Sequence, residues 1–440
     1  MIREMKDSGV EWVGEIPEDW TIRKIKFSLN EHIEKNDPIK SKNILSLTAK
    51  QGVIQLSERE GGGNKPKEDF SAYKLTYPGD IVMNSMNIIS GSVGLSNYFG
   101  CMSPVYYMLR PVHKEDDVRF YNYVFQSKPF QLSLFGLGNG ILVKQTDNDK
   151  FNTVRLRIPM DKLGDVGIPN ISPAEQQQIV HFLDRKCTAI DTAIEKTKKS
   201  IEKLEEYKKA VITKAVTRGL NPDAKMKDSG IEWIGEVPET WGVKQLRKFY
   251  SRRLNKNKYL QEKNLLSLSY GNIIRKNIDT KEGLLPESFD GYNIVEVDDI
   301  VIRGTDLQND HRSLRTGLVK ERGIITSAYM TLKPKAGVNS EYYHYLLHCY
   351  DIEKVFYSMG GGLRQSLDYW DFIRTYVLVP SKHEQMDIVN YIHKKCASVD
   401  SLIAKKQEAI DKWEEYKKSL IYYAVTGKID CRNEVVNAES

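Results

Sequence analysis

A long internal duplication constrains this 440-residue chain more than any other feature of its sequence. Residues 5–20 read MKDSGVEWVGEIPEDW and residues 226–241 read MKDSGIEWIGEVPETW, with twelve of sixteen positions identical. A second block begins at Glu175 and recurs at Glu384, with twenty of 43 positions identical. The period is far longer than the roughly 20–50 residues of a solenoid repeat. We therefore expect two copies of a whole domain, each followed by a helix.

The two copies keep their ends alike and differ in between. Met5 recurs at Met226 and Glu175 recurs at Glu384, so the first copy is the longer one between the two blocks. We place its additional residues as an insertion over 160–171, because the runs RLRIP and YVLVP then align as equivalent closing strands. Short echoes also remain, such as ILSL at 44–47 and LLSL at 265–268. A conserved frame around a changed interior suggests one fold that presents two different recognition surfaces.

The second block predicts two long helices. Each begins with an S-x-x-E capping box, at Ser172 or Ser381, and each pattern ends at a glycine, Gly219 or Gly427. Between these limits, apolar residues recur at alternating spacings of four and three, the heptad pattern of a coiled coil. Two like units in tandem favour a pseudo-two-fold relation, which would pack the helices antiparallel.

The regions between the repeated blocks predict globular domains. YPGDIVMNS and VDDIVIRG are typical of a turn followed by a strand, and RFYNYVFQS and EYYHYLLHCY predict short aromatic helices. The predicted fold class is α+β: two homologous α/β domains with mostly antiparallel sheets, joined by two long α-helices in a pseudo-two-fold symmetric, antiparallel coiled coil. The predicted boundaries are 1–160 for the first domain with its frame segment, 161–220 for the first helix, 221–381 for the second domain, and 382–440 for the second helix and tail.

Composition narrows the class of protein. The chain is 40% hydrophobic and 28% charged, has no apolar run long enough to span a membrane, and lacks the apolar core of a signal peptide at its start. We therefore expect a cytoplasmic location. The five cysteines form no CxxC pair, which argues against a disulfide framework or a zinc finger. A net charge of +6 permits a nucleic-acid partner.

The sequence lacks the motifs of an enzyme that modifies or cleaves DNA. It has no Asn/Asp-Pro-Pro-Tyr/Phe run of an amino-methyltransferase and no GxxxxGK[ST] loop for ATP. The FGLGNG run predicts a turn, because no βαβ unit follows it. His344 and His348 share a helical face without the Glu of a zinc protease, and Cys187 and Cys396 occupy equivalent heptad positions. We therefore predict no catalytic, cofactor-binding or metal-binding residue in this chain.

The candidate binding residues lie in polar loops that differ between the copies. RGTDLQNDHRSLRTG carries three arginines, whereas its counterpart MNSMNIISGSVG is uncharged. Arg recognises guanine edges, Asn and Gln recognise adenine edges, and Lys contacts phosphates. For any single member of this set, the alternative is an ordinary solvated side chain. The predicted DNA-binding residues are Lys50, Gln51, Lys65, Lys67, Asn84, Lys144, Gln145, Arg303, Arg312, Arg315, Arg364 and Gln365.

The order of these features resembles the specificity subunits of type I restriction–modification systems. The carriers of the resemblance are the duplicated opening block, the RLRIP and YVLVP runs, the EQ-led helices and their EEYKK…AVT ends. They extend over essentially the whole chain. The resemblance implies that each variable region is a target-recognition domain that reads one half of a split DNA site. It also implies that the coiled coil sets the distance between the two halves.

The resemblance further implies that partner subunits supply the chemistry. The expected partners are double-stranded DNA and two methyltransferase subunits that methylate adenine N6, and the family also admits restriction/translocase subunits; no membrane is involved. S-adenosylmethionine, ATP and Mg are expected on these partners and not on this chain. Two alternatives stay open: a coiled-coil adaptor without specific DNA recognition, and a DNA-modifying enzyme with a divergent active site.

Overall fold

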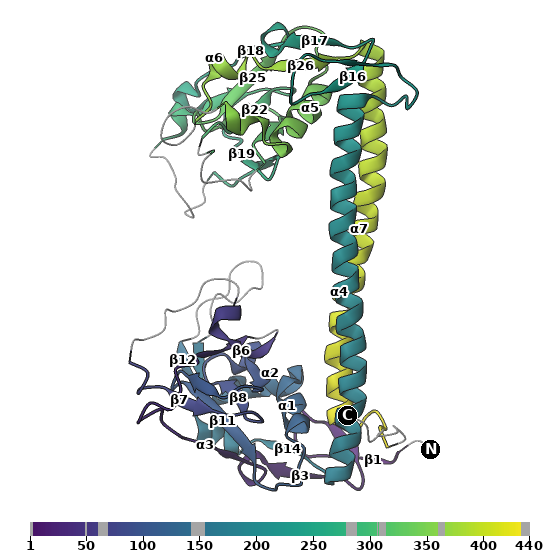
Figure 1. Cartoon of the computed structure of the whole chain (residues 1–440). Helices are drawn as coiled ribbons and strands as arrows, with labels where there is room; N and C mark the ends of the chain where they lie inside the picture. Colours follow the sequence, from purple (N-terminus) through teal and green to yellow (C-terminus); the bar gives the residue numbers. More distant parts are fainter. Residues whose placement is uncertain are drawn as a thin grey trace. The chain divides into compact units, whose positions relative to one another are not determined.

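The computed structural model describes residues 3–48, 51–59, 69–141, 155–278, 288–305, 307, 314–359 and 366–432. The chain forms two compact units (Figure 1). Unit 1 comprises Met1–Thr197 and Glu408–Ser440, and unit 2 comprises Lys198–Gln407. Each unit therefore holds one globular domain and part of each long helix. Among the described residues, no helix is both long enough and apolar enough to cross a membrane.

The domain of unit 1 is built from antiparallel strands. Its four-stranded sheet has the order β4 (Leu29–Glu31), β11 (Tyr106–Pro111), β8 (Ile81–Asn84) and β9 (Val93–Leu95). Five further antiparallel pairs surround this sheet. They are β1 (Met5–Asp7) with β2 (Glu15–Pro17), β3 (Thr21–Lys24) with β14 (Gly167–Asn170), β5 (Leu45–Thr48) with β6 (Gly52–Gln55), β7 (Lys74–Thr76) with β10 (Gly100–Met102), and β12 (Asn139–Ile141) with β13 (Arg155–Arg157).

The domain of unit 2 repeats this topology. Its four-stranded sheet has the order β18 (Tyr250–Arg252), β25 (Met330–Pro334), β22 (Ile300–Ile302) and β23 (Thr316–Leu318). The surrounding pairs are β15 (Met226–Asp228) with β16 (Glu236–Pro238), β17 (Gly242–Gln245) with β26 (Tyr376–Val379), β19 (Leu266–Ser269) with β20 (Asn272–Arg275), and β21 (Asn293–Val295) with β24 (Gly323–Ile325). The two copies therefore share one fold, as the duplication predicts.

The helices include the two long ones that the second block predicts. The long helices are α4 (Pro173–Arg218) and α7 (Lys382–Val425), and the shorter ones are α1 (Val118–Gln126), α2 (Lys128–Ser133), α3 (Met160–Gly164), α5 (Ser340–Ile352) and α6 (Tyr369–Phe372). Ser172 Oγ accepts a hydrogen bond from the Glu175 N–H at 3.3 Å, and Ser381 Oγ accepts one from the Glu384 N–H at 3.2 Å. These bonds satisfy N–H groups that a helix start leaves unpaired.

A repeated tryptophan joins each domain to both long helices. In unit 1, Trp20 is buried and its Nε1–H donates to Glu175 Oε2 at 3.0 Å, in the first turn of α4. Gly427, just after α7, has φ +72°, and a Cβ there would lie 3.0 Å from the Trp20 ring. One side chain thus contacts the start of α4 and the end of α7.

The same junction recurs in unit 2 with the helices exchanged. Trp241 Nε1–H donates to Glu384 at the start of α7 at 2.9 Å, and a Cβ on Gly219, after α4, would lie 3.2 Å from its ring. Further along, Lys208 of α4 pairs with Asp400 of α7 at 2.6 Å. Because the end of α4 meets the start of α7, the two helices run antiparallel in this unit.

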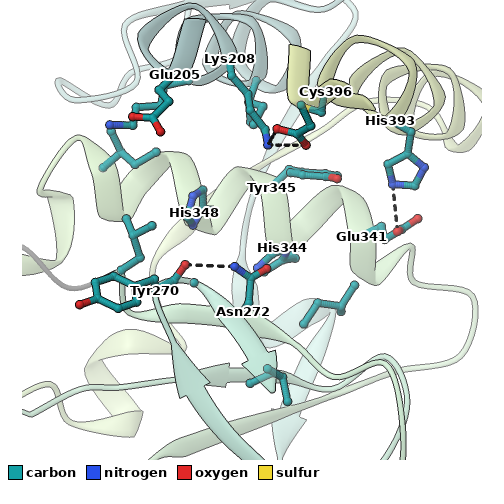
Figure 2. A pocket seen from close by; sticks show the side chains of 18 of the residues that line it. Glu205, Lys208, Tyr270, Asn272, Glu341, His344, Tyr345, His348, His393 and Cys396 are labelled. Carbon is teal, nitrogen blue, oxygen red and sulfur yellow. Dashed lines mark hydrogen bonds and ion pairs between the residues drawn. The ribbon is translucent and has the colours of Figure 1, made fainter. Parts of the chain in front are cut away.

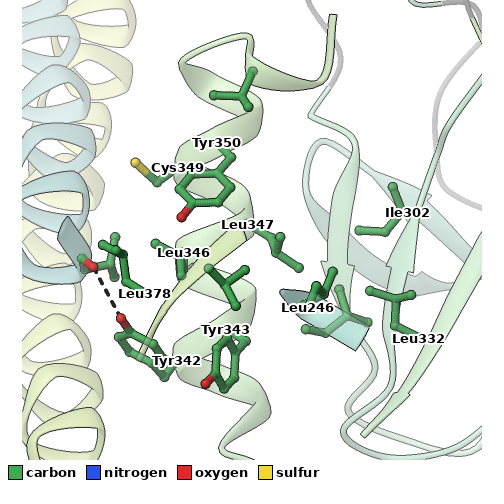
Figure 3. Packing of buried hydrophobic residues seen from close by; sticks show 14 of the residues in the cluster. Leu246, Ile302, Leu332, Tyr342, Tyr343, Leu346, Leu347, Cys349, Tyr350 and Leu378 are labelled. Atoms are coloured by element: carbon green, nitrogen blue, oxygen red, sulfur yellow. Dashed lines mark hydrogen bonds between the residues drawn. The ribbon is translucent and has the colours of Figure 1, made fainter. Parts of the chain in front are cut away.

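The core of the unit 2 domain lies between its sheet and the long helices (Figure 3). α5 places Tyr342 and Leu346 in this layer, and Ile302 and Leu332 cover it from the sheet. The Tyr342 hydroxyl donates to the carbonyl oxygen of Val216 in α4 at 3.4 Å. All four of these side chains are fully buried. The domain and the end of α4 therefore share one hydrophobic core.

The predicted insertion over 160–171 is wrong. β3 and β17 are equivalent, and β3 pairs with β14 as β17 pairs with β26 in the same register. The counterpart of the YVLVP strand is therefore β14, whereas the RLRIP run forms β13 and pairs with β12. The Ile158 N–H donates to the Ser85 carbonyl as the Leu367 N–H donates to that of Gly304, so the alignment of Glu175 with Glu384 continues without a gap back to Ile158. The additional residues of the first copy thus lie before Ile158, toward the β12–β13 hairpin.

Each domain also contacts its long helix through an ion pair, and the polarity of this pair is reversed between the units. In unit 1, Arg119 of α1 pairs with Asp184 of α4 at 3.2 Å. In unit 2, Glu341 of α5 pairs with His393 of α7 at 3.1 Å. Arg119 and Glu341 both follow their N-cap by two positions. The domain therefore supplies the basic partner in one unit and the acidic partner in the other.

Candidate nucleic-acid interface

Two of the predicted residues occupy equivalent positions at the ends of central strands. Asn84 is the last residue of β8, and Arg303 directly follows β22. Both side chains are partly exposed. The backbone N–H of Asn84 donates to Ser92 across the sheet, and that of Arg303 donates to Arg315. An amide can pair with an adenine edge and a guanidinium with a guanine edge. The same position thus carries different base-reading chemistry in the two domains.

Two equivalent hairpin turns, which differ in length, carry further exposed side chains. Exposed Gln51 lies in the β5–β6 turn, where its N–H donates to Thr48 Oγ1 at 3.0 Å. The β19–β20 turn holds Tyr270, whose side chain is 80% exposed and whose φ is +44°. Asn272 Nδ2–H donates to the Tyr270 carbonyl oxygen at 3.2 Å. A large exposed side chain on a left-handed residue is unusual and points to a functional position.

Tyr270 and Asn272 were not among the residues predicted from the sequence. The similar runs ILSL and LLSL could have identified them. These runs mark equivalent strands just before the two turns, so the turn residues could have been compared. The predicted residues were chosen by residue type, as Arg, Lys, Asn or Gln. Residues that follow equivalent strands in the two copies were not compared.

Arg315 has a different place from the one predicted. Its side chain is fully buried, and its Nη1–H donates to the carbonyl oxygens of Arg303 at 3.3 Å and Thr305 at 2.7 Å. Its Nε–H donates to the Tyr357 hydroxyl at 3.3 Å, and its backbone N–H donates to Asp351. Arg315 therefore holds the base of the loop that follows β22, and we no longer assign it a DNA contact. The energetic reason is that moving this buried side chain to the surface would break these hydrogen bonds.

The remaining predicted residues lie outside the described part of the chain and stay predictions. They are Lys50, Lys65, Lys67, Lys144, Gln145, Arg312, Arg364 and Gln365. The described residues contain no group of three or more His, Cys, Asp or Glu side chains placed to hold a metal ion. Cys187 is buried in the coil, as its heptad position predicts, and burial raises the pKa of its thiol to about 11.

Comparison with known proteins gives relatives over nearly the full chain. A type I restriction enzyme specificity subunit, MjaX of Methanocaldococcus jannaschii, is 24% identical over 437 residues, which cover 95% of each protein. No family model matches. A chain from a structure of complex assembly and conformational transition in a type I R-M system has a TM-score of 0.65 and 11% identity, covering 94% of this chain and 99% of its own length. The HsdS subunit of Thermoanaerobacter tengcongensis has a TM-score of 0.49 and 12% identity, with 94% and 98% covered. The resemblance read from the sequence is thus confirmed: this chain is a homologue of type I restriction enzyme specificity subunits.

Proposed function

We propose that this chain is the DNA-recognition subunit of a type I restriction–modification system. It binds a bipartite, asymmetric duplex target and directs an adenine-N6 methyltransferase and a restriction subunit to it, without catalysing either reaction itself. The observation that carries this proposal is a duplicated fold with different side chains at equivalent exposed positions. The alignment with a specificity subunit over 95% of both chains supports it. Neither the adaptor nor the divergent enzyme among the alternatives is favoured by these relatives.

The recognition surface of each domain contains the end of the central strand and the neighbouring hairpin turn. In unit 1 these positions carry Asn84 and Gln51, whose side-chain amides are of the kind that pairs with an adenine edge. In unit 2 they carry Arg303, Tyr270 and Asn272, which favours guanine contacts and base or sugar stacking. Because the two sets differ, the two halves of the target should differ in sequence.

The long helices are the proposed docking surface for two methyltransferase subunits. Tyr207 of α4 and Tyr416 of α7 occupy equivalent positions, and their exposed fractions are nearly equal at 49% and 50%. Paired exposed aromatics are typical of protein interfaces. In this proposal the methyltransferase subunits carry S-adenosylmethionine, and a restriction subunit carries ATP and Mg.

Methylation mapping tests the proposal. Cells that carry this chain together with its methyltransferase partner should show methylated adenines in one two-part motif with unlike halves, and cells that lack the chain should not. Methylation that is unchanged when the chain is deleted would exclude the specificity role. A purified chain that binds no duplex more tightly than random DNA at any salt concentration, alone or with the methyltransferase subunit, would favour the adaptor. Methyl transfer by the chain free of partners would favour the enzyme.

A further inference from the structure

The β19–β20 hairpin of unit 2 turns through an unusual pair of residues. Ser269 pairs with Asn272, so the turn itself consists of Tyr270 and Gly271. Their φ values are +44° and +79°. Two-residue hairpin turns with positive φ at both positions favour Asn-Gly, because asparagine and glycine tolerate the left-handed conformation. A tyrosine in this conformation costs energy, so the surroundings must hold the turn and its exposed Tyr270 ring in place.

A histidine of α5 supports this turn. A Cβ on Gly271 would lie 3.1 Å from His348 Cε1 and 3.3 Å from Leu314 Cβ, so the backbone of the turn packs directly against both side chains. In Figure 2, His348 lies between the turn that carries Tyr270 and the long helices. The helix therefore contacts the turn through its backbone and leaves the Tyr270 side chain outside.

Strand β23 holds His348 in turn. Its Nδ1 lies 3.2 Å from Oγ1 of Thr316, which is fully buried. Burial lowers the pKa of His348 to about 4 and that of the neighbouring His344 to about 3, so both rings are neutral near pH 7. A neutral ring packs against the turn without the cost of a buried charge. Thr316 is also the strand partner of Ile302, the residue before Arg303. One strand thus anchors both the support of the turn and the position of Arg303.

The turn also borders open space. The strands of the hairpin pack on β23, where a Cβ on Gly317 would lie 2.6 Å from Leu268 Cδ1 and 2.8 Å from Ile273 Cδ1. Beside the turn, a cavity of about 640 Å³ lies between the hairpin, α5 and the two long helices (Figure 2). Loss of the His348 ring would therefore give the backbone of Gly271 room to shift.

We propose that His348 is the positioning residue for Tyr270 in DNA recognition. By packing against Gly271 it holds the strained turn, so that the Tyr270 ring stands out to stack on a base or sugar of the second half-site. The inference rests on the proposed function and assigns a residue that acts through another. The matching position of α1 is Gln126, and the β5–β6 turn has three residues where the β19–β20 turn has two. We therefore expect the effect in the half-site of unit 2 only.

A double-mutant cycle tests this role in the full chain with its methyltransferase subunit. The variants are H348A, Y270A and the double variant, with Q126A as the matched control in α1. Y270A should weaken binding to the target duplex about tenfold, as expected for the loss of one stacked base. H348A should weaken binding about fivefold in the wild-type background and have no further effect in the Y270A background, because its effect passes through Tyr270. Q126A should bind as the wild type does.

Two further measurements separate positioning from a general loss of structure. H348N keeps a polar atom near the place of Nδ1 for Thr316 but lacks the Cε1 edge that meets Gly271. It should therefore bind DNA as H348A does, with an unfolding temperature closer to that of the wild type. The fluorescence of 2-aminopurine, placed at each position of the second half-site, reports stacking. The position at which Y270A differs from the wild type should change in the same way in H348A and stay unchanged in Q126A.

The outcomes distinguish this proposal from the proposed function. If H348A and H348N weaken binding equally with and without Tyr270, or leave binding and fluorescence at wild-type values, the proposal is overturned. If Y270A binds as the wild type does, the turn makes no DNA contact and the proposal is also overturned, while the proposed function stands. A wild-type chain without preference for any duplex would instead contradict the proposed function.

Discussion

At the scale of single residues, Arg303 is the strongest base-reading candidate that the structure describes. We expect Arg303→Ala to weaken binding by about 1–3 kcal/mol and to relax one base position in the second half of the motif. Asn84→Ala should relax a position in the first half only. Competition binding against singly substituted duplexes measures both effects. Loss of affinity without any change in base preference would reassign Arg303 to the backbone.

Two histidines should make unit 2 sensitive to acid. His344 and His348 have pKa values of about 3 and about 4 in the folded chain, below the ordinary 6.5. The unfolded chain therefore takes up protons first as pH falls. The contribution of the two neutral histidines to the free energy of unfolding is therefore complete above pH 6.5, and it is lost as pH falls toward 3. At pH 5 the loss relative to pH 7 should be about 2 kcal/mol for each histidine.

The first copy supplies a matched control for this pH dependence. Asn122 and Gln126 occupy the positions of the two histidines in α1. Denaturant unfolding of unit 2 should weaken between pH 7 and pH 5 in the wild type and much less in H344N/H348Q. If the free energy of unfolding has the same pH dependence in both proteins, these two histidines do not have the lowered pKa values given above.

At the scale of elements, replacement of the tryptophan should destabilise the two domain–helix junctions to different extents. Glu175 accepts hydrogen bonds from both Trp20 and Arg3, the latter at 2.6 Å, whereas Trp241 is the one side-chain donor to Glu384 among the described residues. Trp241→Phe therefore removes that donor and should cost about 1–3 kcal/mol, while Trp20→Phe should cost less. Hydrogen exchange at the first turn of each long helix measures the difference. The reverse order of the two effects would contradict this account.

The sequence predicts the long helices of this protein better than its strands and the burial of single side chains. The long helices, their caps and the heptads were predicted correctly because these signals are local and recur every few residues. The closing strand was assigned wrongly because a strand is defined by its partner, and β14 finds its partner β3 at the opposite end of the domain's sequence. Arg315 was misplaced for a similar reason, since its burial depends on Thr305 and Tyr357. Tyr270 was missed because its backbone conformation is visible only in the folded turn.

At the scale of the whole molecule, α4 and α7 are the segments that continue from one unit into the other. Insertion of one heptad after Glu195 and another after Ala404 preserves the heptad pattern and lengthens each helix by roughly 10 Å. If the helices set the distance between half-sites, the preferred spacer should grow by about three base pairs of 3.4 Å each. Methylation mapping should then show loss of the original target, and weak modification at most on a longer spacer. Full methylation of the unshifted target would refute this role of the helices.

A domain exchange tests the modular arrangement. Replacement of residues 242–380 by the corresponding region of a relative should change one half of the motif and leave the other intact, because each half is read by one domain. Motif mapping of the chimera gives the answer. A change in both halves would show that the domains do not read DNA independently.

The reversed polarity of the domain-to-helix ion pairs determines where such a chimera should be cut. A graft that ends at position 380 replaces Glu341 but leaves its partner His393 on the recipient helix. A donor with a basic residue in place of Glu341, as Arg119 is in the first copy, would then leave His393 without its carboxylate partner. A breakpoint beyond position 393 keeps both partners from one parent. The exchangeable module of this protein is therefore a domain together with the first turns of the helix that receives it.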